Sequence, residues 1–411
     1  MNSENSLYKV LPLSFDKEIL LPTSKSHANR ALIIGAIRGS GFQVQSLPLS
    51  TDVTTLLNCF KTVGLLITHN EDSVIFNNSF PACEAEIKEE IIDLKTGDGG
   101  TTNRFLLALL SLGKKTYRFF PSEKMSGRPI DDLLIPLRKL KVSVQTDIGG
   151  AWITLKGPAQ INADAKIEID CSKSTQFASA LMLAFSQQSQ QFELKNIIAS
   201  ETYLKMTEHV LSETKLKKSY DVPVDFSSLS YPLALALIKG KVLIKNCKTI
   251  DPLQADSKFI KLMQDSGADI QWTDKGLLAI SKNNLKPFLV DGSQFPDLVP
   301  TLVFMAAHIP GKSTLKNLSV LRHKESDRLE QILKLLKLFS VKYSFDEAQS
   351  EIMIEGRTKA YPEASVKPAR DHRIVMTAYL FLRANSGGSL AEYDCVEKSF
   401  PHFFNIMCNS N

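Results

Sequence analysis

The sequence predicts an α/β protein built from six copies of one small unit. A short polar cluster followed by an apolar run of helical length recurs along the whole chain. Each copy continues into an amphipathic helix, and the runs 341–345 and 352–354 have the patterns of strands. The predicted unit is therefore a strand and a helix, followed by a second helix and closing strands.

The polar clusters mark the starts of the first helices, because hydroxyl and carboxylate side chains cap the free N–H groups there. They begin at residues 24, 101, 174, 227, 296 and 371. The runs behind them are apolar nearly all round, which predicts helices buried at the centre of a domain. Parallel buried helices would gather free N–H groups and positive partial charge at one end, which favours anionic ligands.

The second helices carry a single apolar stripe at i, i+3, i+4 and i+7. The stripes lie at 53–60, 130–137, 203–210, 259–263, 329–336 and 400–407, and the third and fourth are incomplete. The third unit is also short, because only 21 residues separate Tyr203 from Asp225. This spacing leaves little room for its closing strands.

Composition excludes several classes of protein. The 411 residues suffice for two or more domains, and the mild net charge of +5 is spread out, which argues against nucleic-acid binding. We see neither a signal peptide nor the roughly 18 apolar residues of a membrane span. The six cysteines lack CxxC and Cys/His metal spacings, so we expect reduced thiols and no metal in a cytoplasmic protein.

Cations outnumber acids around the helix starts. The basic residues there are Lys25, Arg30, Arg104, Arg128, Lys324, Arg328, Arg373 and Lys398. The acidic residues are Asp98, Asp297, Glu325 and Asp371. Many cations converging with few acids predict a site for a substrate with several negative charges.

Seven sequence blocks give the chain a specific resemblance. They are LPTSKSHANRAL at 21–32, GDGGTTNR at 97–104, GRPI at 127–130, STQF at 174–177, RHKESDRL at 322–329, DHR at 371–373 and KSFP at 398–401. In this order they resemble the blocks of the 5-enolpyruvylshikimate-3-phosphate (EPSP) synthase family. The similarity runs from about residue 21 to residue 404.

The resemblance implies a fold and a domain organisation. It implies two inside-out α/β barrels with three units each, one formed by 21–223 and the other by 1–20 with 224–411. The active site would lie in the cleft between these domains. The resemblance also implies a cytoplasmic monomer that needs neither a cofactor nor a metal, and whose partners are its two small-molecule substrates.

The implied activity transfers the enolpyruvyl group of phosphoenolpyruvate to the 5-hydroxyl of shikimate 3-phosphate, on the shikimate pathway to chorismate and the aromatic amino acids. Asp297 would take the hydroxyl proton, while Glu325 and Lys25 would exchange the proton at the methylene carbon. The implied shikimate 3-phosphate ligands are Lys25, Ser26, Arg30, Ser174, Thr175, Gln176, Ser200, Tyr203, Asp297 and Lys324. The implied phosphoenolpyruvate ligands are Lys25, Gly100, Thr101, Arg128, Gln176, Arg328, His372, Arg373 and Lys398.

Two alternatives stay open at this point. The sister transferase that acts on UDP-N-acetylglucosamine usually has Asn in place of Ser26 and a loop cysteine, and the segment 113–128 contains no cysteine. A low-activity or non-catalytic anion-binding homologue is the other alternative. Asp98 and Val320 stand where the family usually has Asn, which favours that alternative, whereas retention of Lys25, Asp297 and Glu325 argues against it.

Overall fold

The computed structural model describes residues 7–197, 201–282 and 284–408. The chain divides into two compact units, unit 1 with Met1–Pro22 and Val224–Asn411 and unit 2 with Thr23–Pro223. Each unit encloses a hydrophobic core of its own. The two units are described separately below.

Three buried helices form the centre of unit 2. They are α1 (Lys25–Arg38), α3 (Gly100–Leu110) and α6 (Gln176–Ala184). Each packs against the other two. The apolar residues from Phe105 to Leu110 are fully shielded from water, and each Phe or Leu side chain among them contributes about 1.5–3 kcal/mol through its burial. The prediction of central helices buried on all sides is confirmed for this unit.

Amphipathic helices and three sheets complete unit 2. The helices are α2 (Thr51–Thr62), α4 (Glu123–Ser126), α5 (Asp131–Lys139) and α7 (Glu201–Thr214). The strands are β3 (Phe42–Gln45), β4 (Ile67–Asn70), β5 (Ser73–Phe76), β6 (Ile91–Gly97), β7 (Thr116–Pro121), β8 (Ser143–Ile148), β9 (Ala151–Lys156), β10 (Lys166–Asp170), β11 (Gln191–Lys195) and β12 (Ser219–Asp221).

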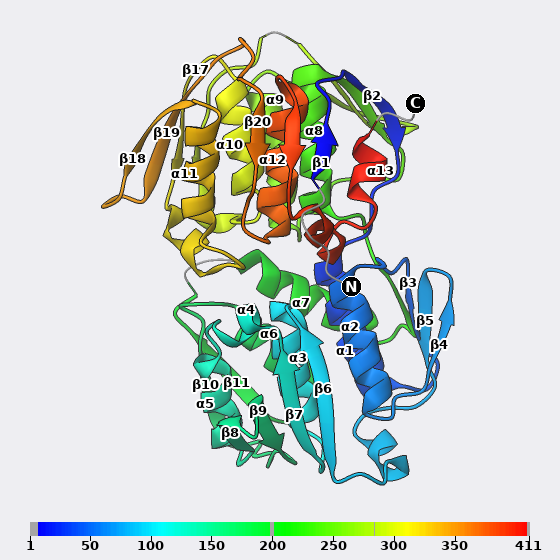
Figure 1. The fold of residues 1–411 in the computed structure, drawn as a ribbon. Helices are drawn as coiled ribbons and strands as arrows, with labels where there is room; N and C mark the ends of the chain where they lie inside the picture. Colours follow the sequence, from blue (N-terminus) through cyan, green and yellow to red (C-terminus); the bar gives the residue numbers. More distant parts are fainter. Residues whose placement is uncertain (1–6, 198–200, 283, 409–411) are drawn as a thin grey trace. The chain divides into compact units, whose positions relative to one another are not determined.

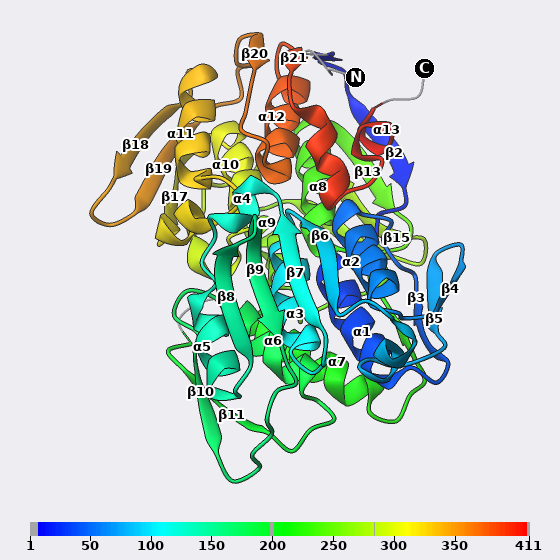
Figure 2. The same ribbon diagram turned by 60° about the horizontal axis from the view of Figure 1, so that its bottom comes forward.

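Two of these sheets share one topology. Their strand orders are β12-β3-β5-β4 and β6-β7-β9-β8, and Figure 2 shows the second sheet with its four strands side by side. In each, the first two strands are parallel and the last two form an antiparallel hairpin. The third sheet contains only the parallel pair β10-β11 among the described residues. The prediction that the third unit leaves little room for its closing strands is therefore confirmed, because the one strand between α7 and Asp225 among the described residues is β12, which pairs with β3.

Unit 1 repeats the arrangement. Its central helices are α8 (Phe226–Lys239), α10 (Val299–His308) and α12 (His372–Ala384), which pack on one another. Figure 1 shows α10 and α12 running beside each other with α11 alongside. The second helices are α9 (Lys258–Asp265), α11 (Arg328–Leu338) and α13 (Phe403–Met407). Of these, α13 has five residues and is shorter than the stripe at 400–407 predicts.

The sheets of unit 1 contain one unexpected strand. Their orders are β14-β15-β13-β2, β16-β17-β19-β18 and β1-β21-β20. The strands are β1 (Tyr8–Val10), β2 (Phe15–Ile19), β13 (Gly240–Ile244), β14 (Asp269–Thr273), β15 (Gly276–Ile280), β16 (Leu289–Asp291), β17 (Gly311–Lys316), β18 (Lys342–Asp346), β19 (Glu351–Gly356), β20 (Ala364–Val366) and β21 (Gly388–Leu390). In the last sheet, β1 comes from the N-terminal segment and runs antiparallel to β21.

Two further findings concern the chain as a whole. Within the described ranges, no helix has both the length and the apolar character that a membrane crossing requires. All six cysteines are free thiols, and Cys59, Cys83, Cys171 and Cys247 are buried. Burial raises the pKa of the Cys59 thiol to about 12, so this group is inert at neutral pH.

Candidate active site

The N-termini of three helices of unit 2 meet around Asp52. Lys25 is the first residue of α1, and its Nζ donates to Asp52 Oδ2 at 2.7 Å. Thr102 in the first turn of α3 donates through its hydroxyl to the Asp52 backbone oxygen at 3.3 Å. These two contacts place a predicted catalytic lysine beside the glycine-rich start of α3. Sequence reasoning missed Asp52, because an acid in the first turn of a helix is commonly only a capping residue.

Gly100 lies against a predicted anion ligand. A Cβ on Gly100 would come 2.5 Å from Arg128 Nη1, so only glycine lets the guanidinium approach the first turn of α3 this closely. Arg128 is held by its backbone N–H, which donates to Met125 in α4 at 3.0 Å. Backbone N–H groups at a helix start and an adjacent guanidinium together form an anion site.

Arg104 joins the other elements of this region. Its Nη1 donates to Gln176 Oε1 at 2.5 Å and its Nη2 donates to the Pro129 oxygen at 2.7 Å. Burial, with a contribution from Arg128, lowers the pKa of Arg104 to about 9. The group remains cationic at neutral pH, and both of these acceptors are uncharged. Its positive charge is therefore available to attract an anion.

Arg30 is a second buried cation in unit 2. Its donors reach Thr207 Oγ1 at 2.8 Å, the Ser26 oxygen at 2.8 Å and the Tyr203 oxygen at 3.1 Å. Burial lowers the pKa of Arg30 to about 10, so it too stays charged. The Tyr203 ring lies below the guanidinium, 5.9 Å from Cζ to the ring centroid. The predicted ligands Ser26, Arg30 and Tyr203 are therefore brought together.

The remaining predicted residues of unit 2 lie at helix starts. Thr175 is buried directly before α6, and Ser174 Oγ accepts the backbone N–H of Gln176 at 3.2 Å. Thr101 is half-buried in the first turn of α3. Ser200 lies outside the described residues. We call Lys25, Ser26, Arg30, Gly100, Thr101, Arg104, Arg128, Ser174, Thr175, Gln176 and Tyr203 the unit 2 half-site.

In unit 1, Asp297 is held between two arginines. Arg328 Nη1 donates to Asp297 Oδ1 at 2.6 Å, and Arg373 Nη2 lies 2.9 Å from Asp297 Oδ2. Burial alone would raise the pKa of Asp297, but Arg373, Arg328 and Lys324 together hold it well below its usual value. The carboxylate is therefore ionised at neutral pH, as a proton acceptor must be.

Asp371 accepts hydrogen bonds from both of these arginines. Its Oδ2 accepts from Arg328 Nε at 2.8 Å and from the Ser326 hydroxyl at 3.1 Å, and its Oδ1 caps α12 by accepting the Arg373 N–H at 3.0 Å. The side chain is fully buried. Burial opposes ionisation, yet Arg328 lowers the pKa of Asp371 below its usual value. A buried cap that also pairs with an arginine fixes the start of α12 relative to α11.

Glu325 has a similar environment. Its Oε2 accepts from His372 Nδ1 at 2.9 Å, and its Oε1 lies 3.0 Å from Lys398 Nζ. Burial would raise the pKa of Glu325, but His372 and Lys398 hold it well below its usual value. Burial also lowers the pKa of His372, so the imidazole is neutral at pH 7 and donates its Nδ1–H. We call Asp297, Lys324, Glu325, Arg328, His372, Arg373 and Lys398 the unit 1 half-site.

One acid of this region carries no predicted role. Asp256 is buried, and its Oδ2 accepts from the Ser227 hydroxyl while its Oδ1 has no hydrogen-bond partner among the described residues. Burial raises the pKa of Asp256 to about 7, and Asp297 adds to the shift while Arg373 opposes it. No motif surrounds it in sequence, because it lies in a short turn before α9. Only the folded chain shows that it adjoins the half-site.

The donor set of unit 1 does not favour a metal ion. Among the described residues, Glu325, Asp371 and His372 bring three potential ligand atoms within 4.8 Å of one another. However, Glu325 is paired with Lys398 and Asp371 is paired with Arg328. These cations occupy the carboxylate oxygens and would repel a divalent ion. The cluster is better suited to an anionic ligand bound by the surrounding cations.

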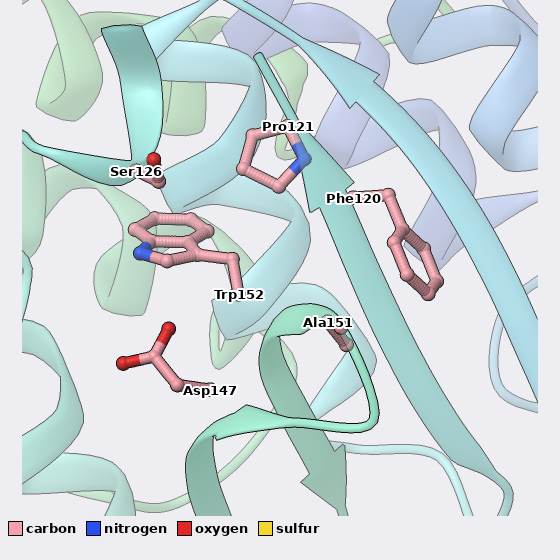
Figure 3. A pocket seen from close by; sticks show the side chains of 7 residues that line it. Phe120, Pro121, Ser126, Asp147, Ala151 and Trp152 are labelled. Carbon is pink, nitrogen blue, oxygen red and sulfur yellow. The ribbon is translucent and has the colours of Figure 1, made fainter. Parts of the chain in front are cut away.

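A separate pocket opens on the sheet that contains β7 and β9 (Figure 3). It has a volume of about 270 Å³ and is lined by Phe120, Pro121, Ser126, Asp147, Gly150, Ala151 and Trp152. Figure 3 shows the Trp152 indole between Ser126 and Asp147. None of the residues that line it belongs to the predicted site. The pocket is therefore distinct from both half-sites.

Comparisons with known proteins show the family of the chain. The family model described as EPSP synthase (3-phosphoshikimate 1-carboxyvinyltransferase) matches residues 12–407. A 3-phosphoshikimate 1-carboxyvinyltransferase of Pyrococcus abyssi is 29% identical over 404 residues, which cover 94% of this chain and 93% of that protein. The same enzyme of Syntrophobacter fumaroxidans is 26% identical over 408 residues, which cover 94% of this chain and 95% of that protein.

Solved structures show the same architecture. An EPSP synthase from Acinetobacter baumannii superposes with a TM-score of 0.75 at 22% identity, covering 97% of this chain and 96% of that chain. The enolpyruvyl transferase NikO from Streptomyces tendae gives a TM-score of 0.69 at 11% identity, covering 98% and 96%. The predicted fold class, a two-domain inside-out α/β barrel with three units in each domain, is confirmed by these likenesses. With the family model matching nearly the whole chain, the chain belongs to the EPSP synthase (3-phosphoshikimate 1-carboxyvinyltransferase) family.

Proposed function

We propose that this chain transfers the enolpyruvyl group of phosphoenolpyruvate to the 5-hydroxyl of shikimate 3-phosphate, as the names of its relatives describe. The observation that carries the proposal is the pair of ionised carboxylates in unit 1. Asp297 and Glu325 each lie within hydrogen-bonding or ion-pair distance of two basic side chains. Two such carboxylates supply the two proton-transfer groups that this reaction requires.

The first step adds the acceptor to phosphoenolpyruvate. Asp297 takes the proton of the 5-hydroxyl, and the oxygen forms a bond to the carbon that carries the phosphate. A proton is delivered at the same time to the methylene carbon, which becomes a methyl group. The acid for this transfer is Glu325 or Lys25, the two groups expected at that carbon. The product of the step is a tetrahedral adduct.

The second step eliminates phosphate. The carbon–oxygen bond to phosphate breaks, and the methyl carbon returns one proton to the group that supplied it. The proton that Asp297 took from the hydroxyl leaves with the phosphate. Arg128, Arg328 and Lys398 stabilise the charge of the departing phosphate. Glu325 is ionised without ligands because cations surround it. An arriving phosphate and carboxylate neutralise those cations, so ligand binding raises the pKa of Glu325 toward the range where it can carry the transferred proton.

Both half-sites are proposed to hold the same pair of ligands. The unit 2 half-site contains the buried cations Arg30 and Arg104, which suit a polyanion. Shikimate 3-phosphate is therefore assigned to this half-site. Its proposed ligands are Lys25, Ser26, Arg30, Ser174, Thr175, Gln176, Ser200 and Tyr203 of unit 2, with Asp297 and Lys324 of unit 1. Phosphoenolpyruvate is assigned to Lys25, Gly100, Thr101, Arg128, Gln176, Arg328, His372, Arg373 and Lys398. The two units act as domains, and we place the reaction in a cleft between them.

This arrangement requires the domains to close on the first ligand. Small-angle scattering with and without shikimate 3-phosphate measures the change. A smaller radius of gyration with the ligand supports closure, and an unchanged radius contradicts it.

The chain is also proposed to act as a monomer in the cytoplasm. Reduced, buried thiols are typical of a reducing compartment, and one chain contains every residue assigned to the two ligands. Light scattering after size exclusion measures the molar mass. A mass near 45.7 kDa supports the monomer, whereas twice that mass contradicts it.

Phosphate release tests the proposed reaction. The purified chain is supplied with phosphoenolpyruvate and either shikimate 3-phosphate or UDP-N-acetylglucosamine. Release with shikimate 3-phosphate alone supports the proposal. Release with the sugar nucleotide alone assigns the chain to the sister activity. Release with neither acceptor, in a folded protein, leaves an anion-binding homologue.

A further inference from the structure

Among the described residues, the third sheet of unit 2 has an open edge at the position where every other sheet has a strand. In the other five sheets, the second strand of the parallel pair also bonds an antiparallel strand. These antiparallel pairs are β3–β5, β7–β9, β13–β15, β17–β19 and β21–β1. Strand β11 pairs with β10 alone among the described residues. The position beside β11 is therefore the one such position that the described chain leaves unfilled.

The backbone of β11 presents donors and acceptors to this edge. The Lys195 oxygen accepts from Cys171 N at 2.9 Å, so the backbone groups of Lys195 point toward β10. Backbone groups alternate along a strand, so those of Glu193 also point toward β10. The N–H and C=O groups of Phe192 and Leu194 then point to the open edge. An extended segment could pair with both residues.

The apolar side chains of β11 are only partly covered. Phe192 and Leu194 face the core of unit 2, opposite Ile167 and Ile169 of β10, yet both are only half-buried. In the complete neighbouring sheet, Tyr117 of β7 is fully buried. The absent neighbour therefore leaves apolar surface exposed as well as backbone groups. A docked strand would cover both.

The sheet β1-β21-β20 of unit 1 shows that one short strand is enough to fill such an edge. There β21 is paired with β20 on one side and with β1 on the other. Strand β1 contributes only Tyr8–Val10, from a segment far away in sequence, and Leu390 of β21 is fully buried beside it. A strand supplied from elsewhere can thus replace the hairpin of the other sheets.

The charged side chains on the outer face of β11 favour opposite charges at the facing positions of a neighbouring strand. Glu193 and Lys195 point away from the core and pair with each other at 2.5 Å, and Lys195 Nζ also lies 3.8 Å from Glu168. Their side chains are about half exposed, so these surface pairs are weak and a partner can compete for both charges. Residues directly opposite each other on antiparallel strands share a face, and opposite charges there are favourable. A segment running antiparallel would meet Lys195 first and Glu193 two residues later. The matching order is acidic, apolar, basic, apolar.

We propose that the open edge of β11 is a docking site for an extended segment of a partner protein with this order of residues. A second copy of the chain fits less well, although Glu193, Leu194 and Lys195 themselves follow the order acidic, apolar, basic. If Leu194 of one chain faced Leu194 of the second chain, Asn196 of one chain would face Phe192 of the other. Asn196 is polar and has a φ of 55°, outside the strand, so it would leave Phe192 uncovered.

Amide hydrogen exchange measured by NMR tests the proposal on the full chain. Without a partner, the Phe192 and Leu194 amides should exchange quickly, whereas the Glu193 and Lys195 amides should be protected by β10. The probe is the capped peptide TEVKVT, and the matched control TKVEVT has the same composition with the charges exchanged. We expect the first peptide at millimolar concentration to slow exchange of the Phe192 and Leu194 amides about tenfold or more.

The charges provide a second, independent readout. The control peptide should bind roughly tenfold more weakly, because two attractive pairs become repulsive. The double variant with Glu193→Lys and Lys195→Glu should reverse the preference, and continued protection of residues 193 and 195 would show that β11 is intact. Absence of protection with both peptides, or equal binding of both, would overturn the proposal. Protection that appears without peptide and grows with protein concentration would instead assign the edge to a second copy.

Discussion

Lys25 and Asp52 form an ion pair across the N-termini of α1 and α2, with 2.7 Å between Nζ and Oδ2. Their side chains are only 17% and 7% exposed, so water screens the pair weakly. Thr102 in α3 donates to the Asp52 backbone oxygen. The pair thus holds a predicted catalytic ammonium group beside the start of α3.

Replacing Asp52 with Asn should reduce catalysis while preserving the fold. A hydrogen bond to a charged group contributes about 1.5–3 kcal/mol, so loss of the pair should lower kcat/KM roughly 10- to 100-fold. Steady-state phosphate release measures the effect, and circular dichroism checks the fold. The matched control is Glu201→Gln, which removes the exposed partner of Lys205 and should change little. Wild-type kcat/KM in the Asp52 variant would show that the pair does not position Lys25.

Replacing Gly100 with Ala should weaken the binding of phosphoenolpyruvate. The new Cβ would lie 2.5 Å from Arg128 Nη1, so the guanidinium must move away from the start of α3. We expect KM for phosphoenolpyruvate to rise about tenfold or more, with a much smaller effect on shikimate 3-phosphate. Gly127→Ala is the matched control, because a Cβ there meets no atom within 4 Å. Equal KM values in the two variants would contradict the assigned contact.

Replacing Asp256 with Asn should change how stability depends on pH. The folded pKa of about 7 exceeds the unfolded value of about 3.9, so the folded state retains a proton that the unfolded state releases. The free energy of unfolding of the wild type therefore falls as the pH rises from about 4 to about 7, and Asp256 causes no further decrease above pH 7. Asn does not titrate. Relative to wild type, the variant should gain about 2–4 kcal/mol between pH 4.5 and pH 8.

Urea unfolding at the two pH values measures this gain. Other groups titrate in both proteins, so only the difference between variant and wild type reports on Asp256. A difference that does not change with pH would show that Asp256 is ionised in the folded protein at both values.

The repeated fold could be predicted because its signals are local. A central helix must be apolar on all sides, and this feature appears in the sequence at α1, α3 and α12. The predicted capping by polar side chains is found at α12, where Asp371 caps the helix, whereas α1 and α3 begin without a side-chain cap. The two-stranded third sheet follows from the short spacing between Tyr203 and Asp225. By contrast, β1 has only three residues and no diagnostic alternation. Its pairing with β21 depends on a contact between distant segments.

The candidate site could be predicted only where motifs mark it. Asp297, Glu325 and Arg328 were found through the resemblance, and the structure groups them with Arg373 and Lys398. Asp52 and Asp256 were missed because their roles come from neighbours on other elements. A carboxylate in a first turn or a short loop has the same local pattern whether it caps a helix or adjoins a cation cluster.

In the proposed mechanism, the methylene carbon of phosphoenolpyruvate is protonated and Glu325 takes part in that transfer. The most direct measurement follows the vinyl protons of phosphoenolpyruvate and product by NMR, with shikimate 3-phosphate present in D₂O. The mechanism predicts deuterium in the vinyl positions of the product for wild type and for the surface control Glu330→Gln. For Glu325→Gln it predicts neither product nor exchange. Product that forms without deuterium, or normal exchange in Glu325→Gln, would contradict it.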